Sequence, residues 1–442
     1  MSGTTSSTTS STPALAAPAV AVPARANFFV AAVTFGLFVL AALLSAERKD
    51  ITRGFDEVAH VSYVAQIQHT GDTWPSFDSL RLLDPKTFTF TDLVNYLDHP
   101  PIYYAVLAVS GPNLEGHPQA VLTLRLIDIA IAGLGFAALL GLGLAAGFSR
   151  YEFYAYAIPV ACIPVLVPLA GAVNNDDLAF LGGAIAILGV WQLAATDRAR
   201  WLALALGGVV LASWAKLTGL VLTGAMVGAV VAYLVWRRRW RRPWTIAAAV
   251  ALVVAAIPYV ILMVQYGSPA PDTPAQMALI DNGARVLGLA DLPRKSFIAF
   301  LGYFVVGFVV EWMPTLTPRG IFNYAMLVIP VAALVCAAAG LFVSLRRLWW
   351  RQETALDVVV IAGTAALALT FALHVRHGYG HHLATGWLVE AYPRYYLPLA
   401  AIVPLAALSL ATAMNNSRWR SALLGFLIAG PIMFRILGAP FG

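Results

Sequence analysis

The feature that most constrains this chain of 442 residues is a series of apolar runs, each about twenty residues long, that recurs along most of its length. Hydrophobic residues make up 60% of the sequence and charged residues 11%, whereas about 25% of a soluble domain is charged. Runs of this length match the hydrocarbon core of a bilayer, where a helix satisfies its own backbone. We therefore predict an all-α, polytopic membrane protein.

About eleven transmembrane helices are predicted. Their approximate bounds are 27–46, 120–147, 152–172, 178–195, 201–214, 217–236, 244–265, 321–345, 355–373, 395–413 and 421–437. Residues 1–26, rich in Ser, Thr, Ala and Pro, are predicted to form a disordered cytoplasmic tail. The single membrane domain 27–442 would then carry three outer loops, at 47–119, 266–320 and 374–394.

The orientation follows from three arginine clusters between apolar runs, at 237–242, 346–351 and 418–420. Such clusters mark cytoplasmic ends and make nucleic-acid binding a poor interpretation. The amino terminus is then inside, and all eight histidines and most acids face outside. If Phe297–Val310 crossed the membrane, the second cluster would lie outside, so we predict that this segment dips into the outer leaflet and returns. Cys162 and Cys336 lie in apolar runs and indicate no disulfide or metal site.

The first outer loop is the most polar region and contains the stretch Gly54–Tyr104. A helix over 56–69 is predicted to lie along the membrane surface, with Asp56 and Glu57 at its start. A carboxylate there can act as a general base or hold a divalent cation. Stabilisation of the helix amino terminus and a merely solvated loop are the alternative explanations of these acids. From the same loop we take His60, His99 and Tyr103 as candidate substrate-binding residues.

A second acidic group, Asn174-Asn175-Asp176-Asp177, is predicted to form a tight outer turn between two spans. Asx residues satisfy turns well, so turn chemistry alone could explain them. Ionisable groups beside hydrocarbon are costly and are usually kept for function. We therefore predict that Asp176 and Asp177 face Asp56 across a groove, where Asp56 and Asp176 could share a cation such as Mg²⁺ or Mn²⁺.

Cationic candidates lie on the same predicted face. Lys216 is out of place at an outer turn and suggests an anionic partner. Arg394, followed by Tyr395, offers a planar fork that matches phosphate oxygens. Arg53 is either a second phosphate clamp or a salt-bridge partner of the acidic pair. Snorkelling side chains and an aromatic belt are the alternatives for these residues.

The densest histidine cluster is His374–His382, which includes His377. Its glycines predict a flexible loop. Zinc ligation is permitted by the spacing, but we favour contact with lipid phosphate or with an acceptor.

The order of these motifs resembles that of the GT-C membrane glycosyltransferases. The features are the acidic pair, His-Pro-Pro-x-Tyr-Tyr at 99–104, Asn-Asn-Asp-Asp at 174–177 and Arg-Tyr-Tyr-x-Pro at 394–398. The nearest branches are the protein O-mannosyltransferase and aminoarabinose-transferase type and a broad group of uncharacterised bacterial GT-C-like proteins. The resemblance covers about Phe28–Pro398. Many relatives carry a large soluble domain after the last span, whereas this sequence stops at Gly442.

The resemblance implies transfer of a sugar from a polyprenyl-phosphate carrier to an acceptor at the outer, periplasmic face of the cytoplasmic membrane. It implies Asp56 as base with Glu57 as substitute, Asp176 or Asp177 beside the acceptor, and Lys216 and Arg394 on the carrier phosphate. The resemblance leaves open whether the acceptor is a glycan, a lipid or a protein. A transporter or lipid flippase and a ligase or polymerase of whole glycans are the competing interpretations; a transporter tends to carry charges near the bilayer midplane.

Overall fold

The structure is a computed structural model, and it describes residues 25–311, 328–388 and 392–437. In this part of the chain the architecture is a helical bundle with one small β-ribbon. The α-helices are α1 (Arg25–Arg48), α2 (Glu57–Thr70), α3 (Ile102–Ser110), α4 (Val121–Ala145), α5 (Arg150–Ala161), α6 (Leu166–Ala170), α7 (Asp176–Thr196), α8 (Ala199–Ala215), α9 (Leu217–Trp236), α10 (Arg242–Tyr266), α11 (Pro274–Val286), α12 (Phe297–Glu311), α14 (Val328–Trp349), α15 (Ala355–Thr385), α16 (Ile402–Ala413) and α17 (Ser417–Leu437). The described residues also form three short 3-10 helices, η1 (Phe77–Ser79), η2 (Pro118–Ala120) and η3 (Pro393–Leu399).

Among the described residues, seven helices are long and apolar enough to cross a membrane, and the bent pair η3 and α16 makes an eighth if it counts as one span. The multi-pass membrane class is thus confirmed, while the number eleven and the orientation stay predictions. The span predicted at 152–172 is broken into α5 and α6, because Pro164 between them lacks a backbone N–H. Helix α8, at 17 residues, falls short of the length of a span.

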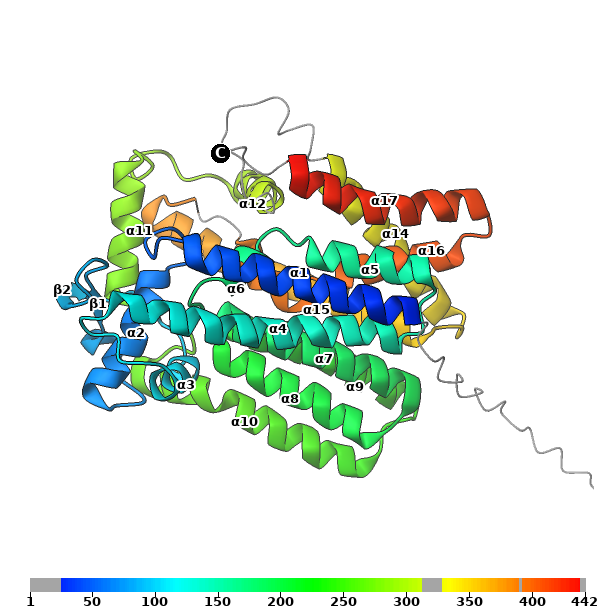
Figure 1. Cartoon of the computed structure of the whole chain (residues 1–442), viewed down its shortest axis with the longest axis horizontal. Helices are drawn as coiled ribbons and strands as arrows, with labels where there is room; N and C mark the ends of the chain where they lie inside the picture. The colour runs from blue at the N-terminus through cyan, green and yellow to red at the C-terminus, as the bar shows by residue number, and fades with distance from the viewer. Residues whose placement is uncertain (1–24, 312–327, 389–391, 438–442) are drawn as a thin grey trace, which may run out of the picture.

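The long helices run side by side, and the elements of the first loop gather with α11 at one end of the bundle (Figure 1). Helix α12 is seen nearly end-on in that view, so it runs across the direction of the long helices. Its apolar part, Phe297–Phe308, is shorter than a span. The predicted return of this segment falls in 312–327, outside the described residues.

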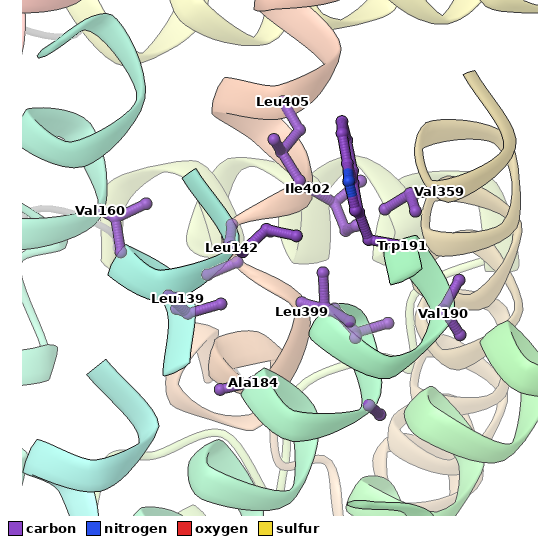
Figure 2. Packing of buried hydrophobic residues seen from close by; sticks show 14 of the residues in the cluster. Leu139, Leu142, Val160, Ala184, Val190, Trp191, Val359, Leu399, Ile402 and Leu405 are labelled. Atoms are coloured by element: carbon purple, nitrogen blue, oxygen red, sulfur yellow. The ribbon is translucent and has the colours of Figure 1, made fainter. Parts of the chain in front are cut away.

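The bundle interior is an apolar cluster contributed by α4, α5, α7, α15, α16 and η3. Figure 2 shows Leu139, Trp191 and Ile402 packed within it. Small residues let the helices approach closely, as is usual in membranes. A Cβ at Gly182 of α7 would lie 2.5 Å from the backbone nitrogen of Ala212 in α8. This packing fixes the start of α7, where the acidic turn lies.

The first loop is a folded cap on the end of the bundle. Helix α2, predicted to lie along the membrane surface, is enclosed within this cap: its residues from Ala59 to Ile67 are buried. Its position relative to a membrane stays a prediction. Strands β1 (Arg81–Leu83) and β2 (Phe90–Val94) pair antiparallel, with Leu83 opposite Phe90, and add a small ribbon to an otherwise all-α architecture of the described residues. Ser62 in α2 accepts a hydrogen bond at 2.8 Å from the backbone of Leu83. That contact ties the ribbon to α2.

Helix α15 contradicts the predicted flexible third loop over 374–385, because it stays helical to Thr385. Its 31 residues correspond to about 46 Å at 1.5 Å per residue, longer than the roughly 30 Å hydrocarbon core. If the first part of α15 spans the membrane, its last turns project beyond it and carry the histidines with them.

Candidate active site

Asp56 lies immediately before α2, in an unusual backbone conformation. Gly54, Phe55 and Asp56 are all left-handed, with φ of 85°, 61° and 57°. Such conformations cost about 1–3 kcal/mol in a residue other than glycine and cluster at functional sites. They turn the chain so that the Asp56 carboxylate accepts hydrogen bonds from Arg394 at 2.7 Å and from the Tyr96 hydroxyl at 3.1 Å.

The Asp56 side chain remains 39% exposed, so it is accessible as well as paired. Burial raises the pKa of Asp56, but the Arg394 guanidinium and the Tyr96 hydroxyl outweigh burial and hold that pKa below its ordinary value. Asp56 is therefore ionised at neutral pH, the state that a general base requires.

Arg394 joins two acidic motifs that are far apart in the sequence. Its Nε lies 3.8 Å from Asp176 Oδ2, while its Nη2 holds Asp56. Asp176 also forms a buried ion pair with Lys216. The Lys216 ammonium lies 4.2 Å from the centre of the Tyr395 ring, and the Arg394 guanidinium lies 5.4 Å from the same ring. Two carboxylates, two cations and one aromatic ring therefore form one cluster.

Glu57, next to Asp56, points to different partners. Arg125 donates to both of its oxygens, from Nε at 2.7 Å and from Nη2 at 2.9 Å. The backbone of Val173 donates to the same carboxylate at 2.9 Å. The Glu57 side chain is fully buried and the Arg125 side chain is 7% exposed. Arg125 also donates to the carbonyls of Ala46 and Lys49 at the end of α1, so this pair fastens the first loop to α1, α4 and the acidic turn.

Three predicted substrate-binding residues lie in an internal network beneath the cluster. His60 contacts the Tyr104 hydroxyl at 2.9 Å and the Asn174 amide at 3.0 Å. Tyr103 donates to both oxygens of Asp128 at 2.8 Å. Burial lowers the pKa of His60 well below its ordinary value and that of His99 to about 3, so both imidazoles are neutral. His60 and Tyr103 are buried, and His99 is partly exposed.

Asp177 is buried, and neither of its carboxylate oxygens has a hydrogen-bond partner among the described residues. Turn chemistry accounts for part of the motif, since Asn174 accepts from the backbone of Asp176 at 2.8 Å and Asn175 donates to Ala215 at 2.8 Å. It does not account for Asp177.

Two predicted residues lie apart from the cluster. Arg53 is exposed and lines an open hollow of about 670 Å³ at the end of α1, together with Arg48 and Lys49. Lys49 lies 4.2 Å from the centre of the Phe55 ring and 3.8 Å from Glu57, which places the hollow beside the acidic pair. His377 lies on α15 and contacts His381 instead.

The carboxylates predicted to share a divalent cation, Asp56 and Asp176, are paired with arginine and lysine in this structure. A shared Mg²⁺ or Mn²⁺ ion at these two carboxylates stays a prediction.

Sequence reasoning missed three residues of this region: Arg125, Tyr96 and Asp98. Burial raises the pKa of Asp98 to about 7, and its Oδ1 lies 3.3 Å from His99 Nδ1. An arginine inside an apolar run is itself a functional signal in a membrane protein, so Arg125 could have been found. Nothing in the pattern distinguishes Tyr96 or Asp98 from other loop residues.

Comparison with known proteins gives a limited result. No family model matches the chain, and no curated protein matches it. Among solved structures, the chain is similar to the crystal structure of ArnT from Cupriavidus metallidurans bound to undecaprenyl phosphate. The TM-score is 0.39 and the sequence identity 15%, over 82% of this chain and 79% of that one. The function is therefore inferred from the geometry of the site.

Proposed function

We propose that this protein is a GT-C-type glycosyltransferase of eleven spans that moves a sugar from a polyprenyl-phosphate carrier to an acceptor at the outer face of the cytoplasmic membrane. The observation that carries the proposal is the cluster of Asp56, Asp176, Lys216 and Arg394. It combines an accessible ionised carboxylate with two cations at one end of a membrane bundle. A transfer from a lipid phosphate needs both kinds of group, a base for the acceptor and positive charge for the departing phosphate.

In the proposed reaction, the acceptor hydroxyl oxygen forms a bond to the anomeric carbon while the bond between that carbon and the phosphate oxygen breaks. The hydroxyl proton passes to the Asp56 carboxylate, and the carrier leaves as its phosphate. Arg394 and Lys216 stabilise the negative charge that develops on the phosphate, and Tyr395 packs against both cations. A single displacement of this kind inverts the anomeric centre.

Glu57 has a different role in this proposal. Its carboxylate is buried and already accepts three hydrogen bonds, so it positions the loop that presents Asp56 and does not replace Asp56 as base. The hollow lined by Arg48, Lys49, Asp50 and Arg53 lies beside the acidic pair and offers a net positive charge to a lipid phosphate at the membrane surface.

The experiment supplies purified protein in vesicles with radiolabelled polyprenyl-phosphate sugars and an envelope extract as the source of acceptors. Wild-type protein should move the label to an acceptor, and Asp56→Asn should lower the rate by about 10²–10⁴-fold, the usual contribution of a general base. Asp92→Asn, an exposed acid on β2, is the matched control and should keep the full rate.

Wild-type rates in Asp56→Asn would remove Asp56 from the mechanism. Label that crosses the vesicle membrane while it stays on its carrier would identify a flippase instead. Transfer of whole glycans, without transfer of single sugars, would identify a ligase.

A further inference from the structure

A second constellation lies outside the acidic cluster, on the projecting end of α15. His377 and His381 are four residues apart on this helix, so they share one face. Asp272 approaches that face from the segment between α10 and α11. One ligand atom from each of the three side chains lies within 4.8 Å of the other two. The chain thus brings two imidazoles and one carboxylate to a single point.

The neighbouring histidines are engaged elsewhere, which separates these two from the rest of the cluster. His374 contacts the Tyr396 hydroxyl at 3.2 Å. His382 accepts a hydrogen bond at 2.8 Å from the backbone of Lys295, which precedes α12. The rings of His377 and His381 instead contact each other, with centres 4.3 Å apart and planes tilted by 59°.

We propose that Asp272, His377 and His381 bind a zinc ion. Zinc bonds to nitrogen and oxygen ligands are about 2.0–2.2 Å long in tetrahedral geometry, which sets two ligand atoms about 3.4 Å apart. His381 Nε2 and Asp272 Oδ1 are 3.3 Å apart, close to that spacing. The His377 side chain is exposed, so a rotation can bring its ring nitrogen to the same distance.

The donor set favours zinc over magnesium and calcium. Two neutral imidazoles and one carboxylate suit zinc, whereas Mg²⁺ and Ca²⁺ take oxygen ligands almost exclusively. Three protein ligands leave a fourth position for water or for an anionic group. The site carries one formal negative charge, so a divalent ion bound there is not fully neutralised and keeps an affinity for such a group.

The position of the site gives the ion a structural consequence. Asp272 immediately precedes Thr273, whose side chain caps α11 by accepting from the backbone of Gln276 at 3.1 Å. A metal bond to Asp272 therefore fixes the start of α11 against α15. The zinc ion fastens the second outer loop to the helix that leads towards Arg394, and this function is independent of the transfer reaction.

The test uses the full chain in detergent, stripped of metal with a chelator and then equilibrated with micromolar free Zn²⁺. After desalting, elemental analysis should find about one zinc per chain, as expected for one site. His377→Ala and His381→Ala should each weaken zinc binding by more than the roughly 10–100-fold that loss of an outer hydrogen bond costs. His117→Ala, an exposed histidine of the first loop, is the matched control and should bind zinc as the wild type does.

Cobalt substitution and hydrogen exchange test the same site independently. Co²⁺ in place of zinc should give the visible bands of a tetrahedral site in wild type and not in His377→Ala, a substitution at an exposed position that should leave the fold intact. Zinc should also slow hydrogen exchange over 267–286 in wild type only. No zinc in the wild type, or as much zinc in both histidine variants as in the wild type, overturns the proposal and leaves Asp272 and His381 as an ion pair.

Discussion

The buried pair of Glu57 and Arg125 offers a sharp test of how the site is built. Both side chains are almost completely removed from solvent, and two hydrogen bonds of 2.7 and 2.9 Å join them. Removing one member of such a pair leaves an uncompensated buried charge, which costs about 3–5 kcal/mol. Glu57→Ala should therefore lower stability by that amount. For a chain of this length the corresponding fall in melting temperature is about 3–5 °C.

The double variant Glu57→Gln/Arg125→Met separates positioning from catalysis. Replacing both members of a buried ion pair by neutral groups of similar volume is often close to neutral in stability. The double variant should therefore melt near the wild type. If Glu57 only positions Asp56, the double variant should also keep most of the transfer rate.

Tryptophan fluorescence during heating in detergent measures the melting temperature, since the chain has 12 tryptophans. Transfer of label from the carrier measures activity. A Glu57→Ala protein that melts with the wild type would refute the account of the buried pair. A double variant that is stable but transfers no label would indicate that Glu57 takes part in catalysis.

Two other predictions concern stability. Burial, reinforced by the charge of Asp272, raises the pKa of Asp98 from 3.8 to about 7. The folded state therefore holds the Asp98 proton more tightly than the unfolded state does. The free energy of unfolding should then fall as the pH rises between these two values and stay level outside them. At about 1.4 kcal/mol per pKa unit, the free energy of unfolding should fall by on the order of 4 kcal/mol over this pH range. Asp98→Asn should abolish this pH dependence in a series of melting curves recorded in metal-free buffer at different pH values. If the stability of the variant depends on pH as that of the wild type does, Asp98 is not the group responsible. Gly340→Ala should lower the melting temperature, because its Cβ would clash with the Ala406 carbonyl oxygen. Gly228→Ala, whose Cβ would meet no atom within 4 Å, should leave the melting temperature unchanged. Equal melting temperatures for the two variants would refute the predicted clash.

The membrane class was predictable because it depends on apolar length, a local property of the sequence. The meeting of Asp56, Asp176 and Arg394 was predictable for a related reason, since a topology that sends three motifs to one end of a bundle leaves them few places to lie. Which acid pairs with which cation was not predictable. Arg125 and Glu57 are 68 residues apart, and only the packing of α1, α4 and α7 brings them into contact.

The helical end of α15 shows where local reasoning failed. Gly378 and Gly380 each cost about 1 kcal/mol relative to alanine in a helix, which favoured the loop interpretation. Tertiary contacts offset that cost, because Val375 packs with Phe300 and Phe304 of α12. The β-ribbon had a local signal that was overlooked. Asp84, before Pro85, accepts hydrogen bonds from the backbones of Lys86 and Thr87 at 2.9 Å, as an Asx turn does.

The acidic pair shows why adjacent residues of the same type need not share a role. In the sequence, Asp56 and Glu57 are interchangeable acids at a helix start. In the structure, α2 begins at Glu57, and the left-handed backbone of Asp56 directs its carboxylate away from that of its neighbour. One acid faces Arg394 and solvent, and the other faces Arg125 and the interior. The strain at Asp56 can persist because the packed side chains of Glu57 and Arg125 hold the neighbouring chain in place, so the position of the accessible carboxylate depends on the packing of the inaccessible one.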